Sequence, residues 1–162
     1  MQTQQTIAVI DFGSQYNQLI ARRVRDNHVY SVLCAATISP DQLRAMNTVG
    51  LIFSGGPASV YDDGAPRCDP ALFEMGLPIL GICYGMQLGC LLAGGKVTPG
   101  ASREYGRIHL TVTERDDLFA DMPEETTVWM SHGDVVSELS AEFEPLAATP
   151  DRKSTRLNSS HG

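Results

Sequence analysis

One cysteine of this sequence stands where a nucleophile would be expected. Cys83 lies between Gly81 and Gly85, after the short apolar run 78–82 and before an apolar segment with helical character. Glycines at a strand-to-helix turn allow a tight bend that exposes a nucleophile at the carboxyl end of a sheet, here with Cys in place of Ser. We therefore interpret Cys83 as a nucleophile; the alternative is a small buried apolar residue.

A thiolate at such a turn performs acyl transfer, and the N-terminus of the following helix is expected to favour that reactive form. The tetrahedral intermediate carries an oxyanion, which needs N–H donors already in place. The turn supplies one amide from Tyr84. The loop 54–57, with two glycines, is a candidate for the second. On its own this loop could equally be a plain turn.

A cysteine nucleophile also needs a base, and the candidates are the four histidines, His28, His109, His132 and His161. His132 follows an apolar run at 127–130 and is therefore expected at the end of a strand, where it could face the site. The spacing identifies no carboxylate that would orient it. A Cys83–His132 dyad thus stays a weaker hypothesis than the nucleophile itself.

The segments that must position these residues alternate in type. Short apolar runs at 7–10, 29–34, 49–53 and 78–82 predict strands. Helices are expected after Ser14 as N-cap, with a stripe formed by Tyr16, Leu19, Ile20 and Val24, and also from Ser39-Pro40, over 69–75 and after Cys83. Strands alternating with helices predict an α/β fold with a doubly wound, mostly parallel sheet. Cys83 and the loop 54–57 would then share one edge of that sheet.

After residue 95 the pattern changes. Runs at 108–113, 127–130 and 144–149 predict further strands with no long helices between them, so antiparallel pairing is expected. The acidic stretch 116–125 is expected to be a solvated loop or helical turn. The fold class is therefore a mostly parallel sheet with additional antiparallel strands.

Composition limits the possible partners. The chain has 162 residues, which predicts one domain, and its net charge of −7 argues against nucleic acid or an anionic membrane. No apolar stretch is long enough for a membrane span. The cysteines show neither metal-ligand spacing nor a disulfide framework, so we expect no metal and a cytoplasmic location.

The last twelve residues differ from the rest. Residues 151–162 are polar and aperiodic, which is typical of a disordered tail. This stretch also resembles the translation of a widely used sequencing-adapter oligonucleotide. Our hypothesis is a domain over 1–150 followed by a non-native tail over 151–162.

Five motifs together are specific for one family. They lie at 11–24, 54–57, 81–87, 103–106 and 129–134. In type and order they resemble those of the class I (triad) glutamine amidotransferases, and within that class the amidotransferase domain of GMP synthetases. The resemblance spans about residues 6–150 and implies a flavodoxin-like fold, incomplete at its C-terminus.

The resemblance also implies residue roles. Cys83 would attack the side-chain amide of glutamine, releasing ammonia and forming a glutamyl thioester, while Gly56 and Tyr84 would offer the oxyanion-hole amides. Glutamine would be held by a further set, in part through backbone groups: Gln87, Ser131, His132 and Gly133. No cofactor is implied for this part of the enzyme.

In this family the base is not His132 but the histidine of a later His-Pro-Glu motif, which this sequence lacks. We therefore expect almost no glutaminase activity from the chain as written. The family implies a synthetase (ATP-pyrophosphatase) part in the same native chain, which uses ATP and Mg²⁺ to convert XMP to GMP, and a homodimeric full-length enzyme. Two alternatives stay open: a non-catalytic glutamine-binding regulatory module, and a cysteine hydrolase acting on γ-glutamyl peptides.

Overall fold

The computed structural model of this chain describes residues 4–115, 117–149 and 159–160. Four strands form a parallel sheet in the order β2-β1-β3-β4. Their bounds match the four predicted runs closely: β1 (Thr6–Asp11), β2 (Tyr30–Ala35), β3 (Thr48–Phe53) and β4 (Ile79–Gly81). The carboxyl ends of parallel strands share one edge, so the loops after β1, β3 and β4 meet there.

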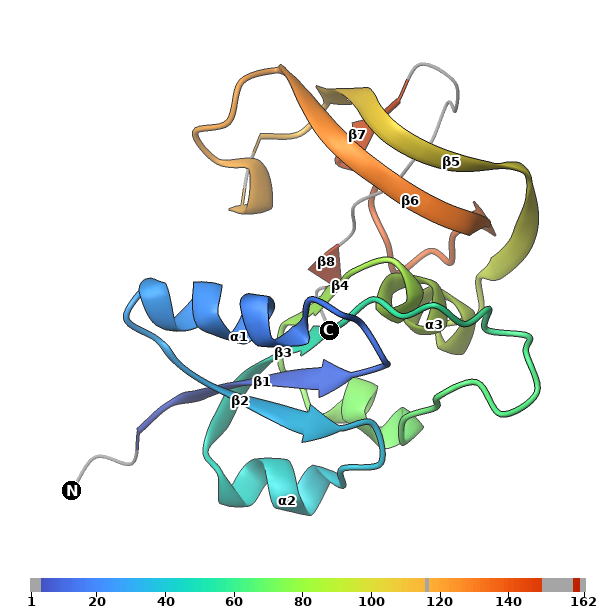
Figure 1. Cartoon of the computed structure of the whole chain (residues 1–162). Coiled ribbons are helices and arrows are strands. Elements are labelled where there is room, and N and C mark those ends of the chain that lie inside the picture. The colour runs from blue at the N-terminus through green and yellow to red at the C-terminus, as the bar shows by residue number, and fades with distance from the viewer. Residues whose placement is uncertain (1–3, 116, 150–158, 161–162) are drawn as a thin grey trace.

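Helical segments connect these strands: α1 (Asn17–Asp26), α2 (Pro40–Ala45), the 3₁₀ helix η1 (Pro70–Glu74) and α3 (Tyr84–Leu92). Helices α1 and α2 lie on opposite faces of the sheet (Figure 1), which confirms the doubly wound prediction. The core between the layers is apolar and fully buried, with Ile10, Phe12, Phe53, Leu72 and Leu88 among its members.

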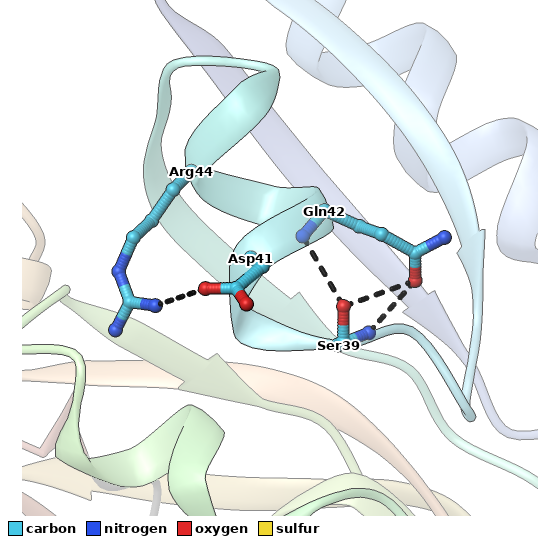
Figure 2. A network of polar contacts seen from close by, with 4 residues as sticks. All are labelled: Ser39, Asp41, Gln42 and Arg44. Carbon is cyan, nitrogen blue, oxygen red and sulfur yellow. Dashed lines mark hydrogen bonds and ion pairs between the residues drawn. The ribbon is translucent and has the colours of Figure 1, made fainter.

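The start of α2 follows the sequence prediction. Ser39 is the N-cap, and its hydroxyl accepts a hydrogen bond from the Gln42 amide at 3.2 Å. The Gln42 side chain in turn accepts from the Ser39 amide at 3.0 Å (Figure 2). Pro40 occupies the first helical turn, where its missing N–H costs nothing. This reciprocal capping box explains why so short a helix begins at this position.

The start of α1 differs from the prediction. The helix begins at Asn17, and Ser14 does not cap it; the Ser14 hydroxyl instead accepts from the Tyr16 amide within the preceding turn. Tyr16 and Leu19, predicted to face the core, are 66% and 46% exposed. The buried residues of α1 are Asn17 and Ala21, and Ile20 and Val24 of the predicted stripe are half-buried.

A second sheet has the order β6-β5-β7 and lies above α1 and α3 in Figure 1. It comprises the long hairpin of β5 (Lys96–Val112) and β6 (Glu125–Glu138), with β7 (Ala147–Ala148) pairing antiparallel to β5. A short 3₁₀ helix, η2 (Asp117–Phe119), lies in the connection. The antiparallel pairing is confirmed, but β6 continues well past Met130, so His132 lies inside a strand rather than at its end.

The inner face of this sheet has its own small core, made of Leu110, Val112, Phe119 and Ala147. Of the predicted tail, residues 151–158 and 161–162 lie outside the described residues. Its other two residues form β8 (Ser159–Ser160), which pairs antiparallel with β4. In the part of the chain that the structure describes, no helix is long and apolar enough to cross a membrane.

Candidate active site

Cys83 lies at a sharp turn between β4 and α3. It is the N-cap residue of α3 and has φ 47° and ψ −112°, a backbone conformation that non-glycine residues rarely adopt. Its side chain is exposed, whereas Cys34, Cys68 and Cys90 are buried. A strained, exposed nucleophile at the carboxyl end of a strand is the arrangement of a nucleophile elbow.

The two flanking glycines are required by close backbone contacts. A Cβ on Gly85 would lie 2.4 Å from the Phe53 carbonyl oxygen, and one on Gly81 would lie 2.7 Å from the Met86 Cα. Real Cβ atoms do not approach that closely, so neither position accepts a larger residue without movement of the backbone. The Gly-x-Cys-x-Gly pattern therefore has a steric cause in this fold.

The loop after β3 lies directly beside Cys83, as predicted. A Cβ on Gly55 would be 3.5 Å from the Cys83 Cβ. The Gly85 amide donates to the Ser54 carbonyl at 3.0 Å, and the Ile82 amide donates to the Phe53 carbonyl at 2.9 Å. These bonds attach the start of the loop to the elbow, so the two segments hold one another in place.

The amides of Gly56 and Tyr84 are available for a ligand. Within the described residues, neither N–H donates a hydrogen bond to the protein. Gly56 is pressed against the β1–α1 connection, because a Cβ at that position would lie 2.2 Å from the Phe12 carbonyl oxygen. Two unpaired amides next to an exposed thiol are the groups that an oxyanion hole requires.

Burial opposes the effect expected from the helix N-terminus at Cys83. The helix N-terminus is expected to favour the thiolate, whereas burial of the sulfur by surrounding atoms raises the pKa of the Cys83 thiol above its ordinary value. The residue is exposed as a whole while its sulfur is partly desolvated. This thiol therefore needs a base to become nucleophilic at neutral pH.

Gln87 joins the elbow helix to the second sheet. It is 5% exposed, and its side-chain amide donates to the Asp134 carbonyl at 3.1 Å. This bond brings the segment 131–134 to α3, close in sequence to the nucleophile. The side chains of Ser131 and His132 lie outside the part of the structure that is described; in the backbone, His132 pairs with Glu104 and Ser131 with Tyr105. Gly133 is half-buried.

Of the other histidines, His28 and His109 lie elsewhere in the structure. His28 is exposed just after α1, and His109 lies on the β5–β6 hairpin, where its Nε2 is 3.4 Å from the Glu125 carboxylate. His161 lies outside the described residues. Among the described residues, no group of His, Cys, Asp and Glu side chains is arranged to hold a metal ion.

Sequence reasoning assigned only a backbone role to Tyr84, whereas its side chain also contacts the site. The ring is 1% exposed and packs on Phe12, and the hydroxyl donates to the Pro66 carbonyl in the loop after β3. A tyrosine directly after the nucleophile was visible in the sequence, but its partners are far away along the chain.

Fold and site together define a class I glutamine amidotransferase. The family model described as glutamine amidotransferase class-I matches residues 8–159, and the chain belongs to this enzyme family.

Within that family, the chain is highly similar to one kind of enzyme. It is 54% identical over 153 residues to the GMP synthase [glutamine-hydrolyzing] of Ligilactobacillus salivarius, covering 93% of this chain and 29% of that protein. It is 55% identical over 147 residues to the protein of the same name from Geobacillus kaustophilus, covering 91% and 29%. The chain thus spans less than a third of the length of these relatives.

Solved structures agree on the fold. A Thermoplasma acidophilum protein, provisionally named as one subunit of a GMP synthase, superposes with a TM-score of 0.77 at 24% identity, over 97% of this chain and 77% of that one. A glutamine amidotransferase from Thermotoga maritima gives a TM-score of 0.66 at 17% identity, over 98% and 70%. At these identities the likeness concerns the fold, which is the flavodoxin-like fold of the class.

Proposed function

We propose that the site is built to hydrolyse glutamine and deliver its amide nitrogen as ammonia. The Cys83 sulfur attacks the side-chain carbonyl carbon of glutamine, the C–N bond breaks, and ammonia leaves as a γ-glutamyl thioester forms. Water then cleaves the thioester to glutamate and restores the thiol. The observation that carries this proposal is the elbow itself: an exposed, positive-φ Cys83 beside two amides with no partner in the described residues.

In this proposal the Gly56 and Tyr84 amides stabilise the oxyanion on the substrate carbonyl oxygen. This assignment is supported by the position of the Gly55 backbone next to Cys83. From there, the loop can reach a substrate carbonyl whose carbon is bonded to the Cys83 sulfur. Glutamine itself would be held by Gln87, Ser131, His132 and Gly133. The Gln87 bond to Asp134 supports the participation of that segment by fastening it to the elbow helix.

We further propose that the chain as written turns over glutamine very slowly. The sequence contains no His-Pro-Glu motif, and the raised pKa of Cys83 leaves the thiol mostly protonated at neutral pH. Loss of a triad histidine can lower kcat by a factor on the order of 10⁶. A slow residual rate would come from the oxyanion hole and from binding.

The relatives at about 55% identity support the proposal that this domain serves a larger reaction. We propose that the ammonia is used by an ATP- and Mg²⁺-dependent synthetase part to convert XMP to GMP, as in purine nucleotide synthesis in the cytoplasm, and that the complete enzyme is a homodimer. In this proposal ATP and Mg²⁺ bind the synthetase part, and the amidotransferase domain holds no cofactor. Residues 151–162 remain, in our proposal, a tail foreign to the domain.

Protection of Cys83 from alkylation tests whether the site binds glutamine. The chain would be treated with iodoacetamide with and without glutamine, and labelling of Cys83 would be followed by mass spectrometry, with asparagine as the control. We expect glutamine to slow the labelling and asparagine to leave it unchanged. Equal labelling under all three conditions would refute a glutamine site.

Release of glutamate then separates the remaining possibilities. We expect almost no release from free glutamine, and none above background for Cys83→Ala. A rate comparable to that of a complete amidotransferase domain would contradict the proposed inactivity and would restore His132 as a candidate base. Protection without any turnover in the complete natural protein would favour a regulatory glutamine-binding module. Cleavage of γ-glutamyl peptides but not of glutamine would indicate a cysteine hydrolase.

A further inference from the structure

The loop that follows β3 is long and lacks regular structure before η1. It runs over residues 54–69 and includes Gly56, whose amide is one of the proposed oxyanion donors. The side chain of Val60, near the middle of the loop, is fully buried. A loop of this length needs specific attachments if one of its amides is to keep a fixed position.

Tyr84 supplies one such attachment from the elbow helix. Its side chain is 1% exposed, and its hydroxyl donates to the carbonyl of Pro66, near the far end of the loop. Burial is the largest effect on this phenol and raises the pKa of Tyr84, so the hydroxyl keeps its proton and remains a donor at any pH where the enzyme would work. A second attachment is internal to the loop: the Arg67 guanidinium donates to the Val60 carbonyl.

The ring of Tyr84 reaches the other end of the same loop through Phe12. The two ring centroids are 5.5 Å apart, and the carbonyl oxygen of Phe12 lies only 2.2 Å from where a Cβ of Gly56 would be. The Phe12 amide also donates to the Ser54 hydroxyl at 2.9 Å. The Tyr84 side chain is therefore connected to both ends of the loop that carries the Gly56 amide: directly to Pro66 through its hydroxyl, and to the start of the loop through Phe12.

We propose that Tyr84 is a positioning residue of the oxyanion hole. Its side chain keeps the Gly56 amide correctly placed relative to the amide of Tyr84 itself, so that both can donate to one oxyanion. The residue thus contributes one donor through its backbone and places the other through its ring and hydroxyl. This inference rests on the proposed glutamine chemistry. A purely structural role for Tyr84 would affect stability but would not affect oxyanion stabilisation selectively.

The test compares two ways of alkylating Cys83. With the chloromethyl ketone analogue of glutamine, the sulfur first adds to the ketone carbon, which places a negative charge on the ketone oxygen in the position of the substrate carbonyl. The sulfur then bonds to the methylene carbon as chloride leaves, and the ketone C=O bond re-forms as the first C–S bond breaks. With iodoacetamide, the sulfur displaces iodide and no oxyanion forms. The ratio of the two rates therefore reports on the oxyanion hole and cancels effects on the thiol itself.

The variants are Tyr84→Phe, which removes only the hydroxyl, and the matched control Tyr61→Phe, which alters an exposed tyrosine of the same loop. We expect Tyr84→Phe to lower the ketone rate roughly tenfold and to leave the iodoacetamide rate unchanged, because a small misplacement of a donor has a large effect on rate. Tyr61→Phe should change neither rate. If Tyr84→Phe does not fold, Arg67→Met loosens the same loop and should give the same selective loss.

An unchanged ratio of the two rates in folded Tyr84→Phe would overturn the inference while leaving the proposed function intact. Chloroacetone, which has the same reactive group but no amino-acid portion, tests whether the site recognises glutamine at all. If the unaltered chain reacts no faster with the glutamine ketone than with chloroacetone, the proposed function fails, and the inference fails with it.

Discussion

At the scale of single residues, Cys83 combines two opposing features. Its positive φ and its place at the start of α3 expose it to a ligand, while the desolvated sulfur favours the neutral thiol. The helix N-terminus favours the thiolate, whereas burial of the sulfur acts in the opposite direction and raises the pKa of Cys83. A raised pKa fits a cysteine that depends on a base to form its thiolate.

This balance predicts the pH dependence of alkylation. Because the folded-state pKa of Cys83 is raised, its thiolate fraction at neutral pH is lower than that of an unfolded cysteine and grows only as pH rises through the raised value. The alkylation rate of Cys83 by iodoacetamide should reach half its maximum at a certain pH. We expect this pH to be higher in the folded chain than in the chain unfolded by urea. Peptide mapping across an alkaline pH series measures both, and a lower midpoint in the folded chain would mean that the helix N-terminus dominates.

At the scale of elements, local signals decide where α2 begins. The capping box of Ser39 and Gln42 satisfies two amides that the helix itself cannot pair. The Asp41–Arg44 ion pair on the same helix is 2.9 Å long, but both side chains are mostly exposed (Figure 2). Exposed pairs of this kind contribute little, so the cap rather than the ion pair should stabilise the helix.

Two substitutions test that ranking. Ser39→Ala removes the acceptor for the Gln42 amide, and we expect it to lower the free energy of unfolding by about 1 kcal/mol. Arg44→Ala removes the ion pair and should change it by less than about 0.5 kcal/mol. Urea titrations of both variants measure these differences. A larger loss for Arg44→Ala than for Ser39→Ala would reverse the assignment.

At the scale of the whole molecule, the parallel sheet and the β5–β6 hairpin are joined at α3. The hydrogen bond from the side chain of Gln87 to the Asp134 carbonyl crosses between them, and the Lys96–Glu138 ion pair lies near the base of the hairpin. The donor of the first is only 5% exposed, whereas the side chains of the second are 71% and 64% exposed. The Gln87 bond should therefore contribute more to the position of the hairpin.

We expect Gln87→Met, which keeps the side-chain volume but removes the donor, to lower the free energy of unfolding by about 1–3 kcal/mol, since the Asp134 carbonyl is left unpaired. Hydrogen exchange should accelerate in residues 133–138 and stay unchanged in β1 and β3. Lys96→Ala is the matched control on the same hairpin and should have almost no effect. Uniformly faster exchange throughout the chain would show that Gln87 supports the fold globally instead.

Much of the fold could be predicted from the sequence because the signals for it are local. Short apolar runs located the parallel strands, and Ser39-Pro40 located the start of α2. The start of α1 was misplaced because Ser14 bonds within its own turn rather than to the helix. The extent of β6 was also missed, since it depends on pairing with β5 and not on its own polar residues 131–134.

The sequence alone determined that this chain presents a cysteine between two glycines after a buried strand, because glycine is the only residue that fits such close backbone contacts. It also determined the family through motifs whose order along the chain is itself specific. Only the tertiary structure decided the burial that raises the pKa of Cys83 and the partners of Tyr84 and Gln87. Desolvation and long-range hydrogen bonds depend on which segments pack together, and no local pattern encodes those distances.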